Sequence, residues 1–180
     1  MLPDPLHPAV VHFPVVLAAL LPVVAGVALA VLLKKGFSRG PWIVVVATSM
    51  ALAGTAWMAI ETGEEEEEVV EDVVSESVIH DHEEAAEAFL ITAGITALIL
   101  ATGLLPGLPG TAGRYAGTAM TLAVLIMGVR VGHSGGELVY VHGAGQAYTS
   151  GTASGGDSDR SSRATRDDDD DDDDDDRRDE

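Results

Sequence analysis

The six histidines of this chain are its best candidates for metal-ligating side chains, and all lie near the ends of apolar segments. They are His7, His12, His80, His82, His133 and His142. Imidazole nitrogens ligate haem iron axially and also ligate Zn²⁺ and Cu²⁺. A histidine at the entrance of a membrane helix is costly unless it has a partner or a ligand. The pattern therefore favours a histidine-based cofactor or metal site.

The chain contains no cysteine, which excludes disulfides, cysteine zinc sites, iron–sulfur clusters and covalent c-type haem attachment. It also lacks an HExxH pair, a Ser–His–Asp order and a glycine-rich phosphate loop. Hydrolytic catalysis therefore has little support. We expect a carrier or accessory subunit rather than an enzyme.

Four mostly apolar segments predict transmembrane helices, at about residues 9–33, 41–60, 83–105 and 114–132. The first spans roughly 37 Å as a helix, against a hydrocarbon core of about 30 Å. Hydrophobic residues make up 47% of the chain although its net charge is −19, because acidic residues lie between and after the apolar segments. The expected fold is an all-α integral membrane protein, a four-helix antiparallel bundle.

We assign residues 1–148 to this transmembrane domain and 149–180 to a disordered tail of Gly and Ser followed by aspartates. Within the domain, residues 61–82 are expected to form an acidic loop. Valines at spacings of one, three and four predict a short amphipathic segment in that loop.

The basic residues predict the orientation of the bundle in the membrane. Lys34, Lys35 and Arg39 lie between the first two helices, and Arg114 lies between the last two. By the positive-inside rule these connections are cytoplasmic. We therefore expect a multi-pass plasma-membrane protein with both termini outside and every histidine at the outer end.

We rank the histidines as ligands by their positions at the helix starts and ends on the outer side. His12, His82 and His133 can turn inward at similar depth, so we predict that they bind the cofactor. His80 lies two positions from His82, about 200° around a helix, and cannot share its inward face.

The remaining candidates are expected to surround the ligands. His7 is expected to be extended because it precedes Pro8, and His142 lies beyond the last helix. The positions expected around the site are His7, Glu61, Glu83, Gly135, Gly136, Tyr140 and His142.

Three interpretations of the site stay open. Haem b with two axial imidazoles is the first, because small residues can line a slot for the macrocycle. The second is a Zn²⁺ or Cu²⁺ site in which Glu61 or Glu83 adds an oxygen ligand. In the third, the histidines hydrogen-bond helix ends in a structural or assembly subunit without a cofactor.

Three motifs resemble one family of bacterial membrane proteins. They are LHPAVVHFP at the start, HEEAAE before the third helix and GHSGGELVYVHGAG after the fourth. The chain is similar over about residues 2–147 to the family called domain of unknown function twenty-two thirty-one. The motif histidines of that family correspond here to His7, His12, His82, His133 and His142, whereas His80 is outside its pattern.

The resemblance implies four helices but no established activity. Members of this family occur beside cytochrome c or Rieske-type modules, which implies membrane redox work with such proteins as partners. We therefore expect haem-linked electron transfer in a lipid bilayer and no nucleic-acid partner. The oligomeric state stays open.

Overall fold

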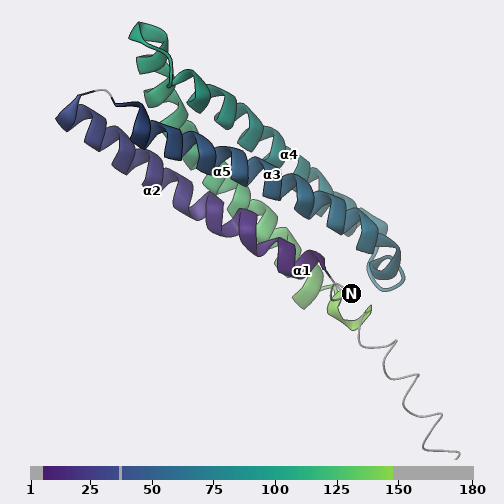
Figure 1. Cartoon of the computed structure of the whole chain (residues 1–180). Helices are drawn as coiled ribbons and strands as arrows, with labels where there is room; N and C mark the ends of the chain where they lie inside the picture. Colours follow the sequence, from purple (N-terminus) through teal and green to yellow (C-terminus); the bar gives the residue numbers. More distant parts are fainter. Residues whose placement is uncertain (1–5, 37, 148–180) are drawn as a thin grey trace, which may run out of the picture.

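The computed structural model describes residues 6–36 and 38–147, and these form helices joined by short connections (Figure 1). The tail predicted for residues 149–180 lies outside the described residues. The helices are α1 (His7–Val10), α2 (His12–Lys35), α3 (Arg39–Val70), α4 (Glu76–Thr102) and α5 (Gly107–Tyr140).

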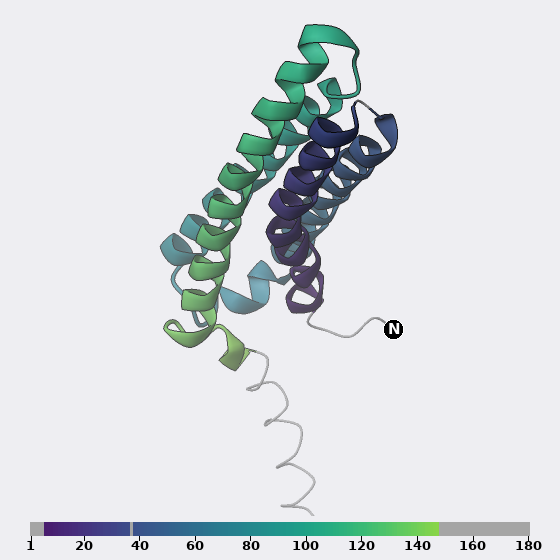
Figure 2. The same cartoon turned by 90° about the vertical axis from the view of Figure 1, so that its left-hand side faces the viewer.

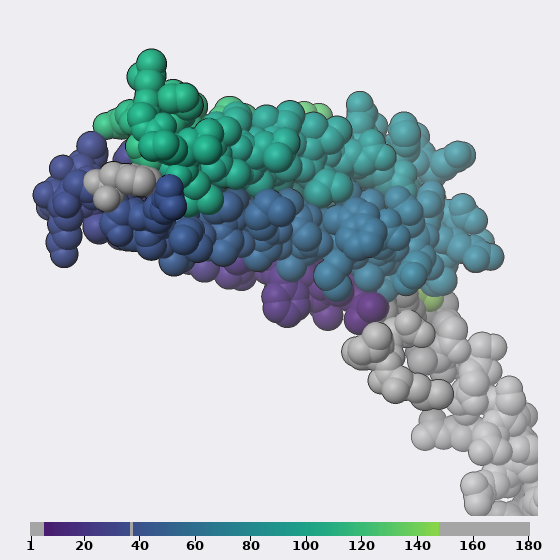
Figure 3. Space-filling model, turned by 45° about the horizontal axis from the view of Figure 1, so that its top comes forward, coloured from purple at the N-terminus to yellow at the C-terminus, as the bar shows by residue number. Residues whose placement is uncertain are grey.

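Four of the described helical segments are long and apolar enough to cross a membrane: α1 with α2, then α3, α4 and α5. This confirms the predicted all-α class with four candidate spans. Each long helix packs against the next, and α5 returns to pack against α2, which closes the bundle. Figure 2 shows α2 and α5 diverging toward the end where α1 lies. Figure 3 shows α3 and α4 in contact along one face of the bundle.

The distribution of side-chain sizes is typical of a bundle surrounded by lipid. Much of the buried core is alanine, including Ala18, Ala25 and Ala93, while large apolar side chains such as Leu98 and Ile126 face outward. Small residues let helix backbones approach closely where no hydrophobic effect drives them together. The large outward side chains would instead contact lipid tails.

Glycines and two long polar side chains fix the end of the bundle opposite α1. Gly113 and Gly117 on α5 pack so closely on α4 that an added Cβ would meet α4 atoms. Trp42 donates its indole N–H to the Leu100 carbonyl at 2.9 Å, which ties α3 to α4. Arg114 donates to the Gly103 carbonyl at 2.5 Å. These contacts hold the helices together at one end while the other end is left wider.

The acidic segment differs from the loop expected at residues 61–82. Helix α3 continues through the glutamates to Val70, a short turn follows, and α4 begins at Glu76. Glutamate has a high helix propensity, so the run can extend a helix that has left the hydrocarbon. The valines form no separate surface helix. Val74 and Ile79 instead bury against Ala144, which follows α5.

Helix α5 is also longer than expected, since it continues through the glycines near position 133 to Tyr140. Glycine costs about 1 kcal/mol per residue in an exposed helix, but glycines are frequent in membrane helices. The extension keeps residues 133–140 helical. It therefore decides which of their side chains face the bundle.

Candidate functional site

A cavity of about 550 Å³ lies where the helices diverge, at the end that carries α1. We call it the histidine cavity because three imidazoles contribute to its wall. Its lining comes from all the helices: His7, Pro8, Val11, His12, Pro14 and Val15; Ala56, Ala59, Ile60 and Gly63; His82, Ala86 and Phe89; Gly128, Val131, Gly132, Gly135, Gly136, Val139 and Tyr140. Apart from the imidazoles and the Tyr140 hydroxyl, these side chains are apolar.

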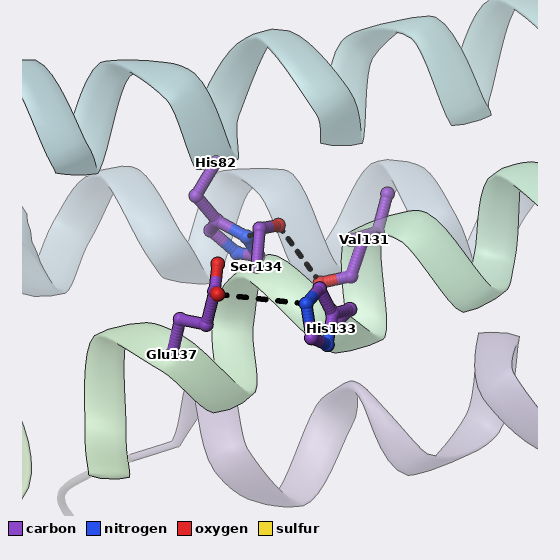
Figure 4. Close-up of polar contacts among 5 residues, drawn as sticks. All are labelled: His82, Val131, His133, Ser134 and Glu137. Atoms are coloured by element: carbon purple, nitrogen blue, oxygen red, sulfur yellow. Dashed lines mark hydrogen bonds and ion pairs between the residues drawn. The ribbon is translucent and has the colours of Figure 1, made fainter. Parts of the chain in front are cut away.

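His82 enters the cavity from α4, and α5 positions its ring. Its Nδ1 lies 2.8 Å from the Ser134 hydroxyl, and that hydroxyl donates to the Val131 carbonyl at 3.0 Å. Since the hydroxyl hydrogen is already used, the serine oxygen accepts a hydrogen bond from the His82 Nδ1–H. Gly135 allows this approach, because an added Cβ would lie 3.1 Å from His82 Cε1. Figure 4 shows His82 and Ser134 together.

His7 lies at the start of α1 and is held by α3. Its backbone N–H donates to Glu66 Oε1 at 2.8 Å, and its Nδ1 lies 2.9 Å from the Ala59 carbonyl. The prediction that Pro8 holds His7 extended was wrong, because α1 begins at His7. Proline fits the first turn of a helix, where its missing N–H costs little, and Glu66 accepts the N–H of His7. The ring is therefore half-buried in the cavity wall.

His12 lines the same cavity but is positioned by its own helical segment. Its Nδ1 lies 2.7 Å from the Pro8 carbonyl one turn earlier, and the residue is exposed. The Pro8 carbonyl, in α1, thus supplies the acceptor for the His12 ring at the start of α2. His12 lies where the prediction placed it, at the entrance of the first long helix.

The three cavity histidines share one protonation pattern. A carbonyl oxygen only accepts hydrogen bonds, so Nδ1 of His7 and of His12 must carry a hydrogen. The Ser134 hydroxyl donates its hydrogen to the Val131 carbonyl, so it imposes the same pattern on His82. In the neutral rings the lone pair is therefore on Nε2. A hydrogen bond to one ring nitrogen commonly sets which nitrogen binds a metal.

His133 does not join the other predicted ligands. Its side chain is 77% exposed and contacts Glu137 at 3.5 Å, one turn away on the same helix (Figure 4). The expectation that it turns inward was wrong because α5 stays helical, which puts the neighbouring Ser134 toward α4. His80 is 75% exposed beside Glu83 at 3.8 Å, on a different face from His82, as the helix geometry predicted. His142 is exposed and is absent from the cavity lining.

The carboxylates proposed as oxygen ligands also lie away from the cavity lining. Glu61 is exposed, Glu83 contacts His80 and Glu67, and neither carboxylate is in the lining. Among residues 6–36 and 38–147, no three His, Asp or Glu side chains converge closely enough to hold a metal ion. The described geometry thus offers imidazoles around an apolar space rather than a compact polar metal site.

Four of the predicted surrounding positions are cavity residues: His7, Gly135, Gly136 and Tyr140. The positioning groups Ser134, Glu66 and the Ala59 carbonyl were missed. A signal for the α5 face was available, since Gly128, Val131, Gly132, Gly135 and Val139 recur at the spacings of one helical face. That face marks the cavity wall, but Ser134 and His133 lie on opposite sides of it, so the spacing alone does not separate them. A backbone carbonyl such as that of Ala59 leaves no signal in side-chain identity.

Comparison with known proteins agrees with the motifs. A family model described as "Predicted membrane protein (DUF2231)" matches residues 3–148, which include every described helix. No curated protein and no solved structure matches the chain. The matched region contains the cavity histidines, the glycines of α5 and all the candidate membrane spans. The chain therefore belongs to the DUF2231 family of predicted membrane proteins.

Proposed function

We propose that the histidine cavity binds haem b and that the protein carries electrons within a membrane redox system. The observation that supports this most is the state of the three cavity imidazoles, each of which commits Nδ1 to an acceptor. The remaining nitrogen, Nε2, is the one that a haem iron needs. His82 from α4 and one histidine from the start of the chain would be the axial ligands.

The size and lining of the cavity fit a mostly apolar group. Its volume of about 550 Å³ lies within the range of roughly 300–1,000 Å³ usual for cofactor sites. Gly132 and Gly136 leave open space at the α5 wall, and Phe89 and Ala86 close the α4 wall. Bound haem would supply one-electron iron chemistry, with a potential set by its axial ligands and by burial. The protein residues hold the rings in place and exclude water.

The basic residues at one end of the bundle support a role for the cavity at one membrane surface. Lys34, Lys35 and Arg39 lie at the end of the bundle opposite α1 and the cavity (Figure 1). We propose that this basic end faces the cytoplasm of a plasma-membrane protein, since positive residues favour that side. The cavity would then face outward. Cytochrome c or Rieske-type proteins would be the electron partners, as the family resemblance implies.

Purified protein tests the proposal through its absorption spectrum and its metal content. After expression with a haem supply and extraction in detergent, we expect sharp visible bands on reduction, with iron as the bound metal. Equimolar zinc or copper in a colourless preparation would favour the metal-ion interpretation. A colourless, metal-free preparation that also fails to take up added haem would favour the structural interpretation.

The exposed histidines provide matched controls for the same experiment. His80→Ala and His133→Ala each remove an imidazole at the same end of the bundle but outside the cavity lining. Both should keep the haem bands, whereas His82→Ala should lose them. Equal loss in His80→Ala and His82→Ala would mean that haem binds elsewhere.

A further inference from the structure

Two of the three cavity histidines are held in the same way by a neighbouring helix, and this distinguishes them from the third. We propose that His7, rather than His12, is the imidazole that pairs with His82 on the bound group. This assignment rests on the proposed haem function. It identifies the axial pair, which the sequence could not do.

Two residues on α5 hold the His82 ring. Ser134 accepts the hydrogen bond from Nδ1, and the adjacent Gly135 lies under the ring, where an added Cβ would be 3.1 Å from Cε1. One group fixes the ring nitrogens, and the other lets the ring approach the helix backbone. The imidazole cannot turn about without losing one of these contacts.

The His7 ring is held in the same way by α3, through hydrogen-bond acceptors and a glycine. The Ala59 carbonyl and the Thr62 hydroxyl lie 2.9 Å and 3.3 Å from Nδ1. Thr62 donates its own hydrogen to the Ala59 carbonyl at 3.0 Å, so its oxygen also accepts from His7. Gly63 lies under the ring, where an added Cβ would be 3.2 Å from Cε1. Glu66 additionally anchors the backbone N–H of His7.

Among the described residues, His12 has neither an acceptor on another candidate membrane span nor a glycine beside its ring. Its acceptor is the Pro8 carbonyl in the preceding turn, and the residue is exposed. No glycine of the described residues has a His12 atom among the three atoms nearest to an added Cβ. A side chain held only by its own segment moves with that segment. Ring orientation held from a second helix is the arrangement expected of a pre-organised ligand.

His7 and His82 also both line the histidine cavity. They come from segments far apart in the sequence and are supported by different helices, α3 and α5. Imidazoles contributed by two different elements are what an iron with two axial ligands requires. His7 and His12 instead belong to one short stretch of chain.

Replacing each histidine with glycine and adding imidazole tests the assignment. A glycine variant that folds leaves a hole that free imidazole can enter, so recovery of the spectrum also shows that the protein is folded. We expect the full-length protein with His7→Gly to lose its two-imidazole bands and to regain them with imidazole. His12→Gly should keep the bands without any addition.

Loss of the bands in His12→Gly, with recovery in imidazole, would overturn the assignment while leaving the haem proposal intact. Wild-type protein that takes up no haem would instead refute the haem proposal itself. A second variant tests the support of the His7 ring by α3 without removing the imidazole. Gly63→Val should push the His7 ring and weaken haem binding at least tenfold, whereas Gly54→Val, in open space on the same helix, should not. Equal affinity in these two variants would also count against His7.

Discussion

Ser134→Ala removes the one side-chain acceptor that holds His82 from α5. Without haem, the freed imidazole can rotate or bind water. When Nε2 binds iron, however, Nδ1–H must face the alanine methyl group without a partner. Leaving a buried donor unsatisfied costs about 1–3 kcal/mol, and because the haem-free state escapes that cost, it appears as weaker binding.

At about 1.4 kcal/mol for each factor of ten, this cost corresponds to roughly five- to hundredfold weaker binding. Removing a residue that orients a metal-bound histidine commonly costs about 10–100-fold in affinity, which agrees. We therefore expect the dissociation constant for haem to rise about tenfold or more. The helix itself should not weaken, since alanine has a higher helix propensity than serine.

Titration of haem into detergent-solubilised apoprotein, followed by absorbance, measures this change. Ser134→Thr retains the hydroxyl and should bind nearly as the wild type does. Thr118→Ala is the matched control on α5, because its hydroxyl donates to the Arg114 carbonyl within the same helix. Unchanged affinity in Ser134→Ala, or an equal loss in Thr118→Ala, would refute the argument that Ser134 orients His82.

Three further substitutions follow from the same geometry. Gly135→Val should displace the His82 ring and lower haem affinity at least tenfold, whereas Gly94→Val, on α4 outside the cavity lining and with no atom within 4 Å of an added Cβ, should leave haem binding unchanged; the position of the Soret band distinguishes the two. His133→Ala should change haem affinity less than twofold, because its side chain is 77% exposed, and a tenfold loss would contradict the described α5 face. A cysteine at Glu65 should react with an impermeant maleimide in intact cells while one at Ser38 should not, and the reverse labelling would invert the proposed orientation.

The four spans could be predicted from the sequence because their signal is local. An uncharged segment of membrane length has few alternatives to a helix. Charge at the helix ends was less informative. A run of glutamates is compatible with a loop and with a helix that extends into water, and α3 adopts the second.

The candidate site was predicted where one helix decides it and missed where two helices do. The spacing of His80 and His82 was enough to separate their faces. The placement of His133 depended on whether α5 ends before position 133, which the glycines left undecided. His7 was assigned to the periphery from the preference of a residue before proline, but Glu66 and Ala59, far along the chain, decide its position.

Haem titration of the apoprotein, in wild type and in His82→Ala, shows whether the histidine cavity binds haem through His82. His82 is the cavity histidine contributed by α4, so removing it leaves only the two histidines at the start of the chain, His7 and His12. We expect wild-type binding to saturate at one haem per chain with the sharp reduced bands of two axial imidazoles, and we expect His82→Ala to lose those bands. Weak uptake of several haems per chain, with the same spectrum in both proteins, would contradict this expectation.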